Sequence, residues 1–182
     1  VAAALGALGA ALATMVANLS SHKRGWDDRW EEFSNWAEQG KTLHDELIAL
    51  VDADTDAFNA VLAALRLPKS TSEEKQARAA AIEAANCGAI EVPLRVMEVA
   101  LATMKVTRAM ATDGMKQSAS DAGVAALCAR SAVLGAGLNV RINLAGLEDE
   151  KSAQKYRAQA DKLSRNAIEA EAEILAIVEG RC

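Results

Sequence analysis

Residues 1–17 read VAAALGALGAALATMVA, a run that contains no charged side chain. Alanine and leucine favour helix, and Gly6 and Gly9, three residues apart, would let the backbone of another helix come close. The run is shorter than the ~20 strongly apolar residues that span a bilayer. It also lacks the preceding basic segment of a signal peptide. We therefore expect a helix over residues 1–20 that is buried among other helices.

The composition extends this expectation to the whole chain. Hydrophobic residues make up 51% of the 182 residues, whereas aromatic residues make up 3% and there are only two prolines. Sparse β-branched and aromatic residues favour helices over strands, and this length suits one hydrophobic core. We predict an all-α, single-domain bundle that covers residues 1–182 and assembles through helical faces. Its five or six helices include about 1–20, a long second helix over 27–67, 72–110, 118–145 and 148–178.

Three local signals mark weak points or ends in these helices. Gly40 could break the second helix, and Pro93 is expected to kink or split the third because proline lacks a backbone N–H. Ser70 or Ser72 is the expected N-cap of the third helix. The fourth helix is apolar on nearly all sides and should be central, whereas the fifth carries many charges and should lie outside.

Charge and cysteine content exclude several classes of function. The chain has 20 basic and 25 acidic residues, a net charge of −5, so no broad basic surface is available for nucleic acid. Cys87, Cys128 and Cys182 are widely spaced, and we interpret them as reduced thiols of a cytoplasmic protein. His22 and His44 are the only histidines. No cluster has the spacing of metal ligands, so we expect no metal.

Asp54 is the most informative residue of the second helix. It falls in a gap of an apolar stripe with spacings of three and four, predicted to be buried: Leu43, Leu47, Leu50, Phe58, Val61 and Leu65. A buried carboxylate is costly unless it is paired, hydrogen-bonded or protonated. Asp54 is therefore either a proton-transfer group with a raised pKa or a core aspartate satisfied by a neighbouring cap or lysine. Of its neighbours, Asp56 fits a solvated face, and Asp52 could enclose a cationic ligand or contact a partner subunit.

The fourth helix carries a narrow strip of small and polar residues. At 100° per residue, one side of it presents Asp121, Cys128, Ala132, Gly135, Asn139 and Asn143. Such a strip is either a groove for a flat ligand or a seam for helix packing. Arg130 and Arg141 lie on the opposite side and could neutralise acidic neighbours or contact a carboxylate ligand. Trp26, Trp30 and Trp36 form an aromatic wall or, more commonly, packing and subunit contacts.

Several segments in this order resemble one known family. They are 2–10 (AAALGALGA) through Met15-Val16, Leu50 to Asp54 with Ala57-Phe58, Leu67-Pro68-Lys69 with Glu73-Glu74-Lys75, Val92-Pro93-Leu94, Ser120-Asp121, and Asn139 to Leu144. With these residues the chain resembles the cyclodeaminase domain of formiminotransferase-cyclodeaminase and its free-standing bacterial relatives, which include methenyltetrahydrofolate cyclohydrolases. Members usually carry Pro-Gly-Gly-Gly-Ser just before the first helix, and this sequence begins after that point. The tryptophan-bearing stretch also fits the family less well.

The resemblance implies a helical dimer or larger assembly that binds a tetrahydrofolate derivative. It implies conversion of 5-formiminotetrahydrofolate to 5,10-methenyltetrahydrofolate and ammonia, a place in histidine degradation, and a formiminotransferase partner. Asp54 becomes the leading acid/base residue and Asp121 the second. Expected substrate-binding residues are Ser120, Asn139 and Asn143 for the pterin, Asp52, and Lys23, Arg24 or Lys116 for the glutamate tail. A cyclohydrolase is the alternative enzyme, and a non-catalytic helical assembly scaffold is the alternative of another class.

Overall fold

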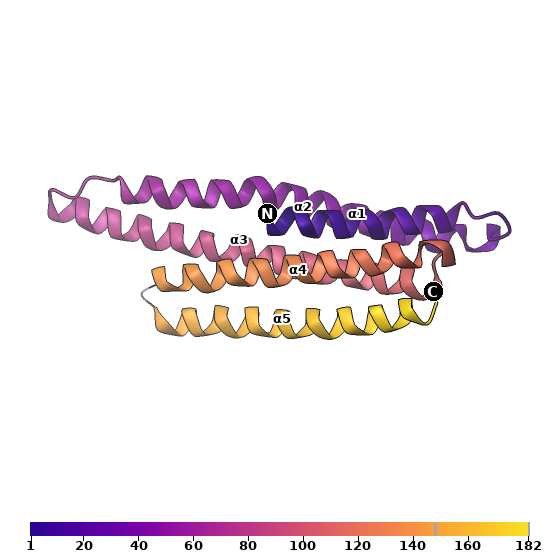
Figure 1. Ribbon diagram of the computed structural model, residues 1–182. Helices are drawn as coiled ribbons and strands as arrows, with labels where there is room; N and C mark the ends of the chain where they lie inside the picture. The colour runs from indigo at the N-terminus through magenta and orange to yellow at the C-terminus, as the bar shows by residue number, and fades with distance from the viewer. Residues whose placement is uncertain (148, 182) are drawn as a thin grey trace.

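Every regular element in residues 1–147 and 149–181, the part of the chain that this computed structural model describes, is a helix (Figure 1). The five long helices are α1 (Ala2–Ser21), α2 (Trp30–Leu65), α3 (Ser72–Asp113), α4 (Ala119–Asn143) and α5 (Glu150–Glu179). Short 3-10 turns connect some of them: η1 (Asp27–Arg29), η2 (Lys116–Ser118) and η3 (Leu144–Gly146). The predicted all-α bundle with a long second helix is confirmed.

α4 lies at the centre of the bundle, where it packs against α1, α3 and α5. Alanines fill most of its buried positions and let the neighbouring helices come near. α5 packs on α4 and α3 at the edge of the bundle (Figure 1). The predicted central position of the fourth helix and outer position of the fifth are both confirmed.

Glycines set the close contacts of α1. A Cβ atom on Gly9 would lie 2.9 Å from the carbonyl oxygen of Ala125 and 3.3 Å from the backbone nitrogen of Ala129, so α1 and α4 touch through their backbones. Gly40 faces α1 in the same way, because a Cβ there would collide with Oγ1 of Thr14. α2 continues through Gly40. The predicted break is therefore wrong, and this glycine serves packing between helices.

Pro93 was expected to kink or split the third helix; α3 is a single helix of 42 residues with Pro93 inside it, so it is not split. Proline has no N–H to donate to the carbonyl four residues earlier, which belongs to Ala89. Nδ2 of Asn143 donates to that Ala89 oxygen at 2.6 Å and replaces the missing bond. The N-cap of α3 is Thr71, not Ser70 or Ser72, and it forms a capping box with Glu74.

The C-terminal half of α2 and the N-terminal part of α3 form a two-helix hairpin that projects beyond the end of α1, and its tip also projects beyond the end of α4 (Figure 1). The predicted buried stripe on α2 is therefore only half right. Leu47 is fully buried against α1, but Phe58 is 62% exposed and Leu65 is 46% exposed, because they lie on the projecting half. Asp54 sits where the covered half of α2 gives way to the projecting half.

Two segments, Ala2–Ser21 and Lys116–Gly146, are long and apolar enough to cross a membrane by length and composition alone. The buried shares of these windows are 44% and 50%. Core helices of a bundle pass the same test, so the finding is weak evidence for a span. The packing of α1 against α2, α3 and α4 agrees with the expectation of a buried first helix.

Candidate active site

Two adjoining cavities lie at the middle of the bundle, and Asp54 lines both of them. The first, about 360 Å³, is enclosed by α1, α2, α3 and α4 and has Pro93 and Ser131 in its wall. The second, about 520 Å³, continues along the hairpin past Phe58 and Asn86. Asn139 also lines both cavities. Each volume lies within the usual range for small-molecule sites.

The Asp54 carboxylate stands at the junction of these cavities in a half-buried position. Apolar side chains surround it on the inner side: Leu5, Val51, Pro93 and Val96. Among the described residues, no lysine, arginine or histidine forms an ion pair with it. A lysine partner, one of the two structural roles considered for this aspartate, is therefore absent among the described residues. The carboxylate can instead meet a ligand in the cavity.

Two asparagines of α4 line these cavities: Asn139 lines both, and Asn143 lines the second. Asn139 is exposed, so its amide donors and acceptor are available to a ligand. Asn143 is half-buried, and its Nδ2 is already used by the carbonyl of Ala89. The side-chain amide oxygen of Asn143, Oδ1, remains available as an acceptor. Together the two amides suit a flat ligand with hydrogen-bonding groups along one edge.

The other predicted site residues lie elsewhere in the chain. Asp121 is in the first turn of α4, 18 residues before Asn139, which is about 27 Å along the helix axis. Ser120 lies beside it, and Lys23, Arg24 and Lys116 are at the same end of the bundle, after α1 and before α4. Asp52 is exposed and does not line either cavity. Only a second copy of the chain could bring Asp121, Ser120 or these three cations to Asp54.

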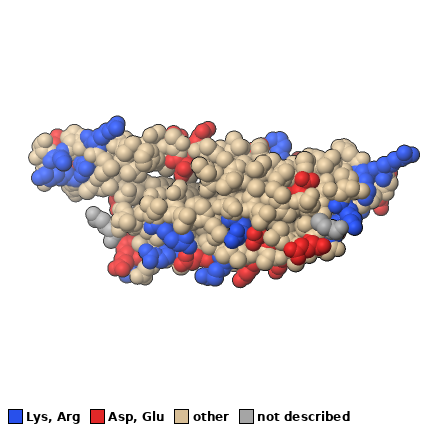
Figure 2. Space-filling view, viewed as in Figure 1, with Lys and Arg blue, Asp and Glu red and all other residues tan. Residues whose placement is uncertain are grey.

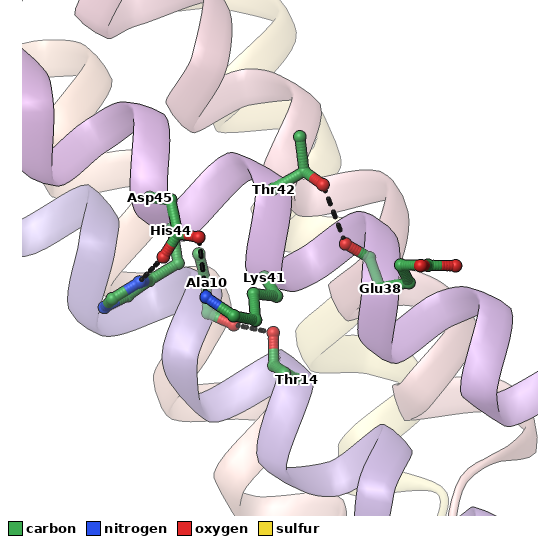
Figure 3. A network of polar contacts seen from close by, with 7 residues as sticks. All are labelled: Ala10, Thr14, Glu38, Lys41, Thr42, His44 and Asp45. Carbon is green, nitrogen blue, oxygen red and sulfur yellow. Dashed lines mark hydrogen bonds and ion pairs between the residues drawn. The ribbon is translucent and has the colours of Figure 1, made fainter.

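A cavity of about 710 Å³ lies at that distant end of α1. Its lining is mostly apolar, with Met15, Leu19 and Met115. Four basic residues line it: His22, Lys23, Lys41 and His44. Nζ of Lys41 and Nδ1 of His44 both contact Asp45, at 2.6 Å and 3.0 Å (Figure 3). The ammonium of Lys23 lies 3.8 Å from the ring centroid of Trp26. This cavity is larger than those at Asp54, but no carboxylate of the described residues lines it, whereas Asp54 lines both of the others.

The strip on α4 therefore serves two purposes. In its middle it is a packing seam, because Cys128 and Ala132 meet Gly9 and Gly6 of α1. At its C-terminal end it becomes the cavity wall formed by Gly135, Asn139 and Asn143.

Arg130, Arg141 and Trp26 have structural partners, whereas Trp30 is 58% exposed. Arg130 pairs with Glu171 at 3.5 Å and Arg141 with Asp161 at 3.0 Å, so both neutralise acidic residues of α5. Trp26 stacks on Phe33 with ring centroids 5.4 Å apart, which is a packing role.

The cysteines of the described chain are free thiols. Burial raises the pKa of the Cys87 and Cys128 thiols, which keeps them protonated at neutral pH. Cys182 lies outside the described residues. Within residues 1–147 and 149–181, no three His, Cys, Asp or Glu side chains gather as metal ligands would.

Sequence reasoning missed three residues of the cavity walls. Ser131 stands eight residues, about two helical turns, before Asn139, so helical spacing could have found it. Phe58 was expected to be buried. Asn86 had no signal at all, because its partner, the carbonyl oxygen of Gly146, is 60 residues away in sequence.

Comparison with known proteins gives a consistent family. The model of the formiminotransferase-cyclodeaminase family matches residues 1–162. A methenyltetrahydrofolate cyclohydrolase of Methylorubrum extorquens is 37% identical over 166 residues, 91% of this chain and 80% of that protein. The formimidoyltransferase-cyclodeaminase of Rattus norvegicus is 35% identical over 181 residues, and the match covers 100% of this chain but only 34% of the rat protein.

A solved structure has the same fold. The crystal structure of formiminotetrahydrofolate cyclodeaminase from Thermotoga maritima superposes with a TM-score of 0.85 at 26% identity, covering 98% of this chain and 85% of that one. The family match spans most of the sequence, and the cavities around Asp54 lie within the matched residues. The chain belongs to the formiminotransferase-cyclodeaminase family.

Proposed function

We propose that this protein is a formimidoyltetrahydrofolate cyclodeaminase, which converts 5-formiminotetrahydrofolate to 5,10-methenyltetrahydrofolate and ammonia. The observation that carries the proposal is the position of Asp54, an aspartate without an ion-pair partner among the described residues, between two cavities that Asn139 also lines. The names of the rat and Thermotoga maritima relatives support this choice of reaction.

The reaction requires one carbon–nitrogen bond to form and another to break. N10 of the folate attacks the carbon of the protonated formimino group (–CH=NH2⁺) and loses its proton, which gives a tetrahedral carbon bonded to N5, N10 and an amino group. The amino nitrogen then gains a proton and leaves as ammonia, so that the cationic methenyl bridge remains. Asp54 would carry the proton from N10 to the leaving nitrogen, and its ionised form would stabilise the cation.

The binding surface has a separate task, which is to hold N10 against the formimino carbon. The side-chain amide of Asn139 and the side-chain oxygen Oδ1 of Asn143 would form hydrogen bonds with the edge of the pterin. Val51, Pro93 and Val96 would limit access of water to the carbon. Exclusion of water matters because hydrolysis of the formimino group would compete with ring closure.

A methenyltetrahydrofolate cyclohydrolase is the second candidate, favoured by the 37% identity to the Methylorubrum extorquens enzyme of that name. There, water attacks the methenyl carbon, loses a proton to a base, and the bond to N5 breaks to leave a formyl group on N10. The same aspartate would serve as that base. A non-catalytic scaffold, the alternative of another class, gives no reason for an aspartate at a ligand-sized cavity.

One assay separates the candidates. The purified protein is supplied with 5-formiminotetrahydrofolate or with 5,10-methenyltetrahydrofolate, and methenyl absorbance and ammonia are followed. A cyclodeaminase releases ammonia as methenyl absorbance appears. A cyclohydrolase consumes methenyl absorbance and yields a formyl product, which would contradict the first proposal. If the protein converts neither folate, the non-catalytic helical scaffold is the candidate that remains.

We also propose that the chain forms a homodimer or higher assembly through one face of α1 and α4. Residues 1–21 carry no charged side chain, and the outer side of these two helices exposes large apolar residues: Leu8, Met15, Leu19, Val124, Leu127, Leu138 and Ile142. An apolar surface of this extent is typical of an interface. A formiminotransferase partner is supported by the longer animal relatives. The free thiols Cys87 and Cys128 support a reducing cytoplasm.

A further inference from the structure

Basic side chains gather at the tip of the α2–α3 hairpin. Residues 66–78 contain four basic side chains, Arg66, Lys69, Lys75 and Arg78, and two acidic ones, whereas the whole chain has a net charge of −5. Figure 2 shows blue side chains concentrated at this projecting end of the molecule. The tip is therefore a local cationic region on an acidic protein.

These cations are free of carboxylate partners. Within the described residues, none of the four basic side chains of the tip forms an ion pair, although Arg29, Lys41, Arg95, Arg108, Arg130 and Arg141 do elsewhere. Of the two acidic residues of the tip, Glu74 accepts from the backbone N–H groups of Ser70 and Thr71 in the capping box of α3. Arg78 donates to the carbonyl oxygen of Leu65 at 3.1 Å and so fixes the end of α2.

A cavity of about 300 Å³ opens among these side chains. Lys69, Lys75 and Arg78 line it together with Ile82, Glu83 and Gly146. Glu83 is its one acidic lining residue, against three basic ones. The cavity therefore suits a small anionic group such as a carboxylate.

This basic cavity neighbours the second cavity at Asp54. Gly146 lines it, and the carbonyl oxygen of Gly146 accepts from Nδ2 of Asn86 at 2.6 Å. Asn86 in turn lines the second Asp54 cavity, so one hydrogen bond links a wall residue of one cavity to a wall residue of the other. Along α2, Asp54 is 11 residues from Leu65, about 17 Å. The exposed ring of Phe58 lies between them, one turn after Asp54.

We propose that the substrate lies along the hairpin, with its reacting carbon at Asp54 and its carboxylate tail at Lys69 and Lys75. This inference rests on the proposed function and adds the orientation of the folate and the site of its tail. The aminobenzoyl ring stacks on Phe58, and each further glutamate of the tail brings a carboxylate to the cationic tip. Within one chain, Lys23, Arg24 and Lys116 lie at the opposite end of the bundle, so the tail of a substrate bound at Asp54 reaches the tip of its own hairpin and not these cations.

The test compares folates with one and with three glutamates. In the Lys69→Gln/Lys75→Gln variant we expect kcat to be unchanged and KM for the triglutamate folate to rise about threefold to tenfold, the effect of two exposed ion pairs. KM for the monoglutamate should change much less. Added salt should raise the triglutamate KM of the wild-type protein and reduce the difference between the two proteins.

The matched control is Lys23→Gln/Lys116→Gln, which removes the same charge at the far end. We expect its KM values to equal those of the wild type for both folates. The proposal is overturned if the tip variant keeps the wild-type ratio of KM values, or if the control variant shows the rise instead. A wild-type protein that converts neither folate would overturn the proposed function itself, a result distinct from an unchanged KM ratio.

Discussion

Asn143 joins α3 to α4 in the wall of the candidate active site. Its Nδ2 donates to the Ala89 carbonyl that Pro93 leaves without a partner, and Pro93 itself lines the cavity beside Asp54. Ala89 is half-buried, and a typical hydrogen bond contributes about 0.5 to 1.5 kcal/mol to stability. Asn143 and Pro93 are therefore coupled, although 50 residues separate them in the sequence.

We predict that Asn143→Ala lowers the free energy of unfolding by about 0.5 to 1.5 kcal/mol, because the half-buried Ala89 carbonyl loses its donor. In a Pro93→Ala background the new backbone N–H supplies that donor, so the same substitution should cost about 1 kcal/mol less. Urea unfolding of the four proteins at one protein concentration measures this cycle. Equal costs of Asn143→Ala in both backgrounds would show that the two residues are independent.

At the residue scale, the sequence singled out Asp54 as a candidate, but it did not predict the residues around it. Residue spacing alone shows that an acidic residue interrupts an apolar stripe. The two cavities lie at the point on α2 where the part covered by α1 ends. The grouping of Asp121 with Asp54 depended on three-dimensional distance, which helical spacing does not report. The contact of Asn86 with Gly146 crosses 60 residues and has no local signature.

At the scale of elements, the contact between α1 and α4 depends on the absence of side chains. We predict that Gly9→Ala destabilises the protein by about 1 to 3 kcal/mol, because its Cβ would press on the backbone of Ala125 and Ala129. Gly88 is the matched control in α3, since a Cβ there meets nothing within 4 Å. Gly88→Ala should stabilise by about 0.5 to 1 kcal/mol through helix propensity.

Thermal or urea unfolding of both variants measures the difference between the two glycines. Loss of stability in both, or in neither, would mean that the α1–α4 distance is not set by Gly9. Enzyme assays on the folded Gly9→Ala protein would also show whether the site tolerates the displacement of α1 from α4.

Helical periodicity predicted five or six helices in this order and the lengths of the long ones, because buried residues recur every three or four positions on each. It did not predict which part of α2 the other helices cover. The pattern on α2 continues from Leu47 to Leu65, yet only its first half is covered by α1. Pro93 does not split α3, because Asn143 of another helix donates the hydrogen bond that the proline cannot make. Contacts between elements decide both points.

For the whole molecule, the uncharged face of α1 and α4 predicts self-association. We expect Leu127→Lys, at a residue that is 42% exposed on this face, to shift the protein toward monomer in analytical ultracentrifugation. Ile168→Lys is the matched control, because Ile168 on α5 is 46% exposed but lies outside the face. The control should sediment like the wild type. Dissociation by Ile168→Lys alone, or by neither variant, would place the interface elsewhere.

The most direct test of the whole account is the turnover of Asp54→Asn with 5-formiminotetrahydrofolate. Because the amide cannot carry a proton between N10 and the leaving nitrogen, we predict that kcat falls about 100-fold or more. The thermal midpoint and folate binding should be retained. Asp56→Asn, which makes the same change at an exposed position two residues along α2, should keep wild-type kcat. A folded Asp54→Asn protein with wild-type turnover would contradict the account.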